Sequence, residues 1–538
     1  MKSLTRVAVA LLAAVTLTAG AAGPGSAVPK NADDKTILHV LNRIGFSARP
    51  GDVDKVREMG LAAYIDQQLH PDRIPDREMA TRLSGLETLN KSARQLADDY
   101  FEPAMRARQQ AKQEAAKNAN GNPSMQDEGK PVRTPEQMEA ARKARQVVTE
   151  LSDQKVLRAA YSDRQLEEVM VDFWFNHFNV FAGKGLTETF LTEYERDAIR
   201  PHVLGKFRDL LEATAKSPAM LFYLDNWQSA DPNAQERLMA ERNARAARFP
   251  FRFPPQRMPN PNQNPQRQKR GLNENYGREL MELHTLGVDG GYTQQDVVNV
   301  ARAFTGWTID QPRQGGGFRF EPRLHDMSEK LVLGHKIKAG GGQSDGEQVL
   351  DILASHPSTA TFISTKLVRR FVSDTPPPAL VERAAKRFHE THGDIRDVLT
   401  TILTSPEFFA ADAYRAKVKT PFEFVVSAVR VTDADVTEAT PLVQAVRTLG
   451  MPLYMCQPPT GYADRAEAWV NTGALLSRMN FALQLVSGKM RGVRPGTSPA
   501  SAALAGDVSS ATAATIAKAS DPQQVAALTL GSPEFQRR

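Results

Sequence analysis

Apolar residues recur at helical spacing along most of the chain. The positions from Thr36 to Ile44 predict one helix, and Gly45 supplies a C-terminal stop for it. Similar patterns predict short helices over 52–59 and 61–69. The hydrophobic pattern therefore indicates a protein built mainly from helices with tight joints.

The alternation typical of a β-strand is clear in one place only. Phe318 and Phe320 alternate with polar residues before a turn, and a second apolar run follows over 330–333. We expect one small β-hairpin there. The predicted fold class is mainly α, a single large helical domain with one small β-hairpin and two polar inserts.

The two polar inserts interrupt the helical pattern. Residues 105–146 are rich in Ala, Gln, Lys and Arg and have almost no large apolar side chain, which predicts a protruding helical pair with a flexible tip. Residues 228–272 contain seven prolines, which disfavour helix and central strand, so we expect an extended surface insert. This insert carries nine Lys or Arg against three Asp or Glu, a net charge of +6.

The N-terminus has the layout of a secretory signal peptide. Lys2 and Arg6 precede an apolar run over 7–17, and small residues follow up to Ala27. The run is too short for a transmembrane helix, which takes about 20 apolar residues. We therefore expect cleavage after Ala22 or Ala27 and export of a chain with no transmembrane segment.

The predicted organisation follows from these segments. A signal peptide occupies 1–27, and one helical domain over 36–487 carries both inserts. An Ala/Ser-rich linker over 495–512 leads to a C-terminal helical segment over 513–538 that belongs to the same domain. The chain has 538 residues, of which 41% are hydrophobic, enough for a sizeable core.

The distribution of net charge along the chain indicates which kinds of partner the protein could bind. The formal net charge of the whole chain is +6, equal to that of the insert over 228–272, so the rest of the chain carries no basic excess. A flexible cationic segment suits contact with an anionic surface. Because no recognition motif is present and export is expected, we predict no nucleic-acid partner.

One predicted helix gathers several polar side chains. Asn273 is a good N-cap for a helix over 274–286, on which Arg278, Glu279 and Glu282 share one face. The two carboxylates are candidate metal ligands or a general acid/base pair, positioned by Arg278. The alternative is a solvated face on which Arg278 and Glu282 form an i,i+4 ion pair.

Two histidines extend the candidate metal site. His177 lies in the aromatic string WFNHF, on a helix predicted to be deeply buried, where an imidazole needs a hydrogen-bonding partner or a metal. His325 and Asp326 form a His-Asp pair in the predicted hairpin turn. The metal candidates are therefore His177, Glu279, Glu282, His325 and Asp326. A hydrogen-bonded core histidine and a turn-forming aspartate remain alternatives.

Several strings occur together and in order along the chain. They are LNRIGFS (41–47), WFNHF (174–178), NENYGRELMELHTLGVDGGYTQQDVVNVARAFTGW (273–307), HPSTATFISTKLVRRFV (356–372), SPEF (405–408), and the PP.GY, W.N and R.N elements between Pro458 and Asn480. With them the chain resembles the bacterial DUF1800 family, a domain of unknown function, from about Thr36 to Ser487 and again at the C-terminal LGSPEFQRR. The resemblance implies a mainly helical exported protein, often encoded next to another exported protein, which is the partner it suggests. It carries over no catalytic residue.

Two functions of different classes follow. The first is an exported enzyme with a divalent metal at the five candidates and with Glu279, Glu282 and Arg278 as catalytic candidates. The second is a non-enzymatic binding or assembly protein whose insert over 228–272 contacts a partner or an anionic surface. Whether the protein is an enzyme, and which cofactor it uses, stay open at this point.

Overall fold

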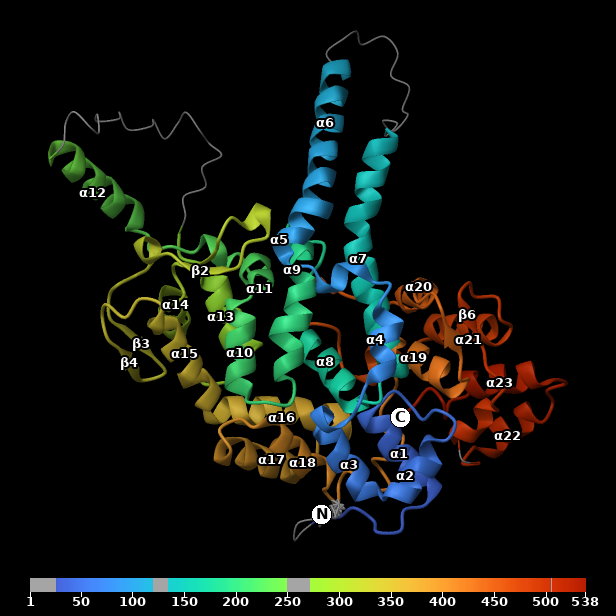
Figure 1. Cartoon of the computed structure of the whole chain (residues 1–538). Helices are drawn as coiled ribbons and strands as arrows, with labels where there is room; N and C mark the ends of the chain where they lie inside the picture. The colour runs from blue at the N-terminus through green and yellow to red at the C-terminus, as the bar shows by residue number, and fades with distance from the viewer. Residues whose placement is uncertain (1–25, 120–133, 249–270, 505) are drawn as a thin grey trace, which may run out of the picture.

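The computed structural model describes residues 26–119, 134–248, 271–504 and 506–538, and most of them are helical (Figure 1). The first half of the chain forms α1 (Asp34–Ile44), α2 (Asp52–Met59), α3 (Leu61–Leu69), α4 (Arg77–Leu83), α5 (Ala93–Leu96), α6 (Glu102–Ala119), α7 (Pro135–Tyr161), α8 (Gln165–His177), α9 (Thr187–Glu193), α10 (Phe207–Lys216), α11 (Pro218–Tyr223) and α12 (Ala234–Arg248). The second half forms α13 (Glu274–Glu282), α14 (Gln294–Ala303), α15 (Ser344–Ser355), α16 (Pro357–Phe371), α17 (Pro378–Glu390), α18 (Ile395–Leu403), α19 (Pro421–Val431), α20 (Thr440–Thr448), α21 (Thr472–Val486), α22 (Ser510–Ile516) and α23 (Pro522–Gly531). The mainly α fold class is confirmed, and so are the three N-terminal helices.

Three small antiparallel sheets accompany the helices. They pair β1 (Trp307–Ile309) with β2 (Phe318–Phe320), β3 (Lys330–Val332) with β4 (His335–Ile337), and β5 (Asp435–Val436) with β6 (Val493–Arg494). The predicted pairing is wrong, because β2 and β3 belong to different hairpins. Leu333 and Gly334 have φ angles of 49° and 79°, the left-handed conformation of a two-residue hairpin turn, so the chain turns back directly after β3.

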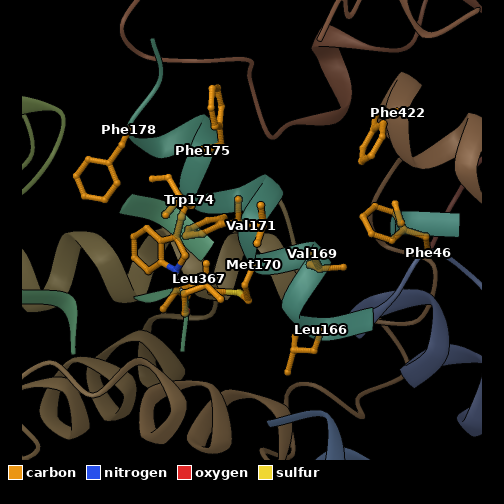
Figure 2. Close-up of a cluster of buried hydrophobic side chains, with 14 of the residues drawn as sticks. Phe46, Leu166, Val169, Met170, Val171, Trp174, Phe175, Phe178, Leu367 and Phe422 are labelled. Atoms are coloured by element: carbon orange, nitrogen blue, oxygen red, sulfur yellow. Dashed lines mark hydrogen bonds between the residues drawn. The ribbon is translucent and has the colours of Figure 1, made fainter. Parts of the chain in front are cut away.

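Helix α8 runs through the centre of the hydrophobic core. Figure 2 shows its side chains Leu166, Met170 and Trp174 among apolar neighbours, with Leu367 of α16 close by. Trp174 is fully buried and donates its indole N–H to the carbonyl oxygen of Val203 at 3.0 Å. The deep burial predicted for this aromatic segment is confirmed. Because the apolar side chains of α8 are packed in the core, the position of its polar face is fixed as well.

The two inserts differ from the core and from each other. Helices α6 and α7 pack together and project from the body of the molecule (Figure 1), as the polar composition predicts. Their connection, 120–133, lies outside the described residues. The expectation that the second insert lacks helix is wrong over 234–248, where α12 forms. Its prolines lie before that stretch and from 250 onwards, so none of them interrupts α12. Residues 249–270 lie outside the described residues.

The ends of the chain bear on two further predictions. Residues 1–25 of the predicted signal peptide lie outside the described part. In the predicted linker, a 3-10 turn forms over Ala500–Leu504 and buries both Ala500 and Leu504 against the core. No helix in the described residues is long and apolar enough to cross a membrane.

Candidate functional site

A pocket of about 200 Å³ opens between α8, α16 and the loop that joins α20 to α21. Polar side chains from all three elements line it: Asp172, Asn176 and His177 of α8, Lys366, Arg369 and Arg370 of α16, and Tyr462, Asp464 and Arg465 of the loop. The three cations of α16 follow i, i+3 and i+4 spacing, so one face of the helix presents all of them to the pocket.

His177 is held in one tautomer by two hydrogen bonds. Its Nε2 lies 3.1 Å from the carbonyl oxygen of His284, and because a carbonyl only accepts, Nε2 carries the proton. Nδ1 is then an acceptor, and Nζ of Lys366 donates to it at 2.8 Å. Burial, aided by the charge of Lys366, lowers the pKa of His177 well below its ordinary value. The imidazole is therefore a neutral, fixed acceptor for Lys366.

The amine of Lys366 is biased towards its neutral form. Burial lowers the pKa of Lys366 to about 8, a change that Asp464 opposes and Arg369 reinforces. The partner given by His177 is uncharged, so it does not offset the loss of hydration as a carboxylate would. Lys366 is thus a partly buried amine whose pKa lies closer to neutrality than that of an exposed lysine.

The pocket carries an excess of positive charge. Its two aspartates are each engaged by a lysine, Asp172 by Lys155 at 3.0 Å and Asp464 by Lys417 at 2.9 Å. Arg370 is paired with Glu423 at 2.7 Å. The three remaining cations of the pocket have no carboxylate partner within 4.0 Å among the described residues: Lys366, Arg369 and Arg465.

Arg369 lies in this positively charged pocket without a full set of hydrogen-bond acceptors among its described neighbours. Its Nε is buried without a hydrogen-bond partner in the described part of the chain. Burial, and next the charge of Arg465, lower the pKa of Arg369. Arg369 and Arg465 thus place two guanidinium groups of like charge beside each other, and Nε of Arg369 has no acceptor among the described residues.

The loop over the pocket is attached to α8 by asparagine side chains. Asn179 donates from Nδ2 to the carbonyl oxygens of Cys456 at 3.0 Å and Pro458 at 2.8 Å. Asn176 bonds to the backbone of Tyr462. Gly461 has φ of 72°, and a Cβ at this position would lie 2.2 Å from the carbonyl oxygen of Asn176. Only glycine fits so closely, so the loop path is fixed by the sequence PPTGY.

The candidates on α13 form a separate group. Asn273 caps the helix as predicted, since its Oδ1 accepts from the N–H of Tyr276. The helix ends at Glu282 and not at 286, because the N–H of His284 bonds back to the carbonyl oxygen of Glu279 in a wider turn. Burial, then the charge of Glu282, raise the pKa of Glu279.

The neighbours of these α13 candidates are protein groups. Arg278 donates to Oε1 of Gln294 at 2.8 Å, and the Tyr292 hydroxyl lies 3.5 Å from Glu282. The expected i,i+4 ion pair between Arg278 and Glu282 is absent from the described contacts.

His325 belongs to a buried network between β2 and β3. Its Nε2 lies 3.1 Å from Oδ2 of Asp345, to which Nζ of Lys330 donates at 2.7 Å, and all three side chains are fully buried. Asp326 accepts from Arg302 at 2.7 Å and from the N–H of Ser328 at 2.8 Å. Arg302 and Ser328 help to lower the pKa of Asp326 to about 2 against the opposing effect of burial. Asp326 is therefore an ion-paired turn residue.

The five metal candidates lie in three different environments. His177 lines the pocket, Glu279 and Glu282 lie on α13, and His325 and Asp326 belong to the network beside β3. Within the described ranges, no group of three or more His, Cys, Asp or Glu side chains is arranged to hold a metal ion. A shared metal site thus finds no support in the arrangement of these ligands.

The residues that sequence reasoning missed are the cations of α16 and Arg465. The string HPSTATFISTKLVRRFV contains Lys366, Arg369 and Arg370 at helical spacing, and this spacing was the available signal. The same spacing also suits a solvated helix face. Only the packing of α16 against α8 and the 451–465 loop distinguishes the two.

Comparison with known proteins places the chain in a family. No curated protein and no solved structure matches it. The sequence model of the family described as "Protein of unknown function (DUF1800)" matches residues 39–537, nearly the whole chain. The pocket between α8 and α16 is lined by side chains from three of the strings that resemble this family: WFNHF, HPSTATFISTKLVRRFV and PP.GY. The chain belongs to the DUF1800 family.

Proposed function

We propose that this is an exported protein that binds a small anionic molecule in the pocket between α8 and α16. The observation that carries the proposal is that the pocket lining holds four cations against two carboxylates, and that three of these cations form no ion pair among the described residues: Lys366, Arg369 and Arg465. Arg465 is exposed, but Lys366 and Arg369 are partly buried, and holding their charges in a partly dry pocket costs free energy unless an opposite charge joins them. A bound carboxylate or phosphate supplies that charge.

The size of the pocket limits the ligand. A volume of about 200 Å³ is below the range of about 300–1,000 Å³ typical of sites for drug-sized ligands. The ligand class is therefore a small organic acid or a phosphate.

Titration calorimetry tests the proposal. We expect at least one of acetate, succinate and inorganic phosphate to bind, and neutral acetamide not to bind. Arg465→Gln removes an exposed cation of the pocket and should weaken binding of that anion about tenfold, the effect of one charge-assisted hydrogen bond. Arg447→Gln, an equally exposed change on α20 outside the pocket, should leave the affinity unchanged. Absence of binding by all three anions, or equal losses in both variants, contradicts the proposal.

The export part rests on the N-terminal sequence. The basic start, the apolar run and the small residues up to Ala27 support secretion. N-terminal sequencing of the protein recovered outside the cytoplasm should begin after Ala22 or Ala27. Recovery in the cytoplasm of a chain that keeps residues 1–27 contradicts export.

A further inference from the structure

We propose that Lys366 forms a Schiff base with a small oxo acid whose carboxylate lies against Arg369 and Arg465. This inference rests on the proposed anion pocket and names the class of its ligand, a carboxylate that also carries an aldehyde or ketone group. It adds a covalent step that simple anion binding does not require.

The hydrogen bond to His177 leaves the reactive electron pair of Lys366 free. Nδ1 of His177 is an acceptor, because its Nε2 proton is directed at the carbonyl oxygen of His284. A neutral lysine amine has two N–H bonds and one lone pair. One N–H bond is directed to His177, so the lone pair is used by no partner in the described contacts of this amine.

Burial provides the neutral amine that the reaction needs. With a pKa of about 8, Lys366 has near neutral pH a neutral fraction about 300-fold larger than that of an exposed lysine. A lysine desolvated next to another cation is a recognised form of activated nucleophile, and Arg369 is that cation here.

The arginines give the pocket its preference for an acid. Arg369 follows Lys366 by one turn on the same face of α16, which corresponds to about 5–6 Å between Cβ atoms. A molecule whose carboxylate adjoins its carbonyl group can therefore contact both residues. Asp172 and Asp464 each contact a lysine and form no ion pair with Arg369 or Arg465 among the described residues, although the charge of Asp464 partly offsets that of Arg369.

The chemistry balances without a further reactant. The lone pair of Lys366 attacks the carbonyl carbon, a C–N bond forms, and the π electrons move to oxygen, which takes up a proton. The first proton on this oxygen comes from the amine nitrogen; the carbinolamine then loses its hydroxyl group together with the second amine proton as water, and the product is an imine. Nothing is oxidised or reduced, and His177 acts as a positioning residue that accepts one N–H bond.

Reductive trapping on the full chain tests the proposal. The protein is mixed near neutral pH with glyoxylate, or with acetaldehyde as the uncharged counterpart, and sodium cyanoborohydride reduces any imine to a secondary amine. Peptide mass mapping then compares Lys366 with the exposed lysines Lys336 and Lys386. We expect glyoxylate to carboxymethylate Lys366 at least about tenfold faster than either control. Arg465→Gln should slow this reaction with glyoxylate and leave the reaction with acetaldehyde unchanged.

The outcomes separate this inference from the proposed function. If Lys366 reacts with glyoxylate no faster than Lys336 while anions still bind in the calorimeter, the Schiff base is overturned and anion binding stands. If Lys366 reacts equally fast with both aldehydes, in wild type and in Arg465→Gln, the carboxylate anchor is overturned, and the anionic ligand class falls with it.

Discussion

The side-chain amide of Asn176 forms two hydrogen bonds with the backbone of Tyr462. Nδ2 donates to the carbonyl oxygen of Tyr462 at 2.9 Å, and Oδ1 accepts from its N–H at 2.7 Å. The amide therefore satisfies both backbone groups of one loop residue, as a neighbouring strand would. This connection joins the last turn of α8 to the loop that closes the pocket.

Replacing Asn176 tests this connection. Asn176→Ala removes both hydrogen bonds and should lower the free energy of unfolding by about 1–3 kcal/mol, measured by denaturant titration. Limited proteolysis should also cut faster within 456–465. The exposed asparagine Asn275 on α13, changed to alanine, is the matched control and should have little effect on either measurement. Equal behaviour of the two variants would contradict the role given to Asn176.

The close approach of Gly461 to α8 predicts a second effect. Gly461→Ala introduces both left-handed strain and a clash with the carbonyl oxygen of Asn176. Gly51→Ala introduces only the strain, since Gly51 has φ of 88° and an added Cβ there meets no atom within 4 Å. Thermal unfolding should show that Gly461→Ala is less stable than Gly51→Ala by at least about 1 kcal/mol. A loss no greater than that of Gly51→Ala would show that the loop can move away from α8.

The pKa of Lys366 predicts how stability changes with pH. The folded state lowers this pKa from 10.5 to about 8, so between these pH values the unfolded chain binds more protons and the stability contributed by Lys366 rises with pH. Below about pH 8 the buried ammonium is destabilising. Lys366→Met removes the ammonium, so its stability relative to wild type should be greatest below pH 8 and fall as pH approaches 10.5.

Denaturant titrations of both proteins across this pH range measure the difference. The exposed lysine of α17, in the variant Lys386→Met, is the control and should differ from wild type by nearly the same amount at every pH. A constant difference for Lys366→Met as well would be evidence against a lowered pKa at this position.

The buried network of His325, Lys330 and Asp345 predicts a non-additive response. Lys330→Met leaves the carboxylate of Asp345 buried without its cation and should cost about 3–5 kcal/mol of stability. The double variant Lys330→Met with Asp345→Asn removes both charges and should be less destabilised than the single one. Calorimetric unfolding measures the stability of the single and the double variants. A loss in the double variant equal to the sum of the two single losses would contradict the charge pairing.

Much of the fold could be predicted from local patterns. The helices over 52–59 and 61–69 follow directly from apolar spacing and adjacent glycines. The pairing of β3 with β4 could not be predicted in this way, because it depends on the left-handed turn at Leu333 and Gly334. The proline content of the insert as a whole does not predict helix α12, because its prolines all lie outside Ala234–Arg248.

The candidate site was harder to predict. His177 was identified from its aromatic surroundings, and it does line the pocket. Its partner Lys366 comes from a helix that lies 189 residues further along the chain, and no local pattern connects the two. The acidic pair Glu279 and Glu282 on a helix suggests a chemical role, but the same pattern is common on solvated faces, so the sequence does not distinguish the two.

A crystal soaked in selenate tests most directly whether the pocket is an anion site. Selenate is an oxyanion whose selenium atom can be located by anomalous scattering. We predict the strongest selenium peak between Arg369, Arg465 and Lys366, and its loss in Arg465→Gln crystals grown in the same form. A pocket without a peak, in a crystal that shows selenate elsewhere on the protein, would contradict the proposed function.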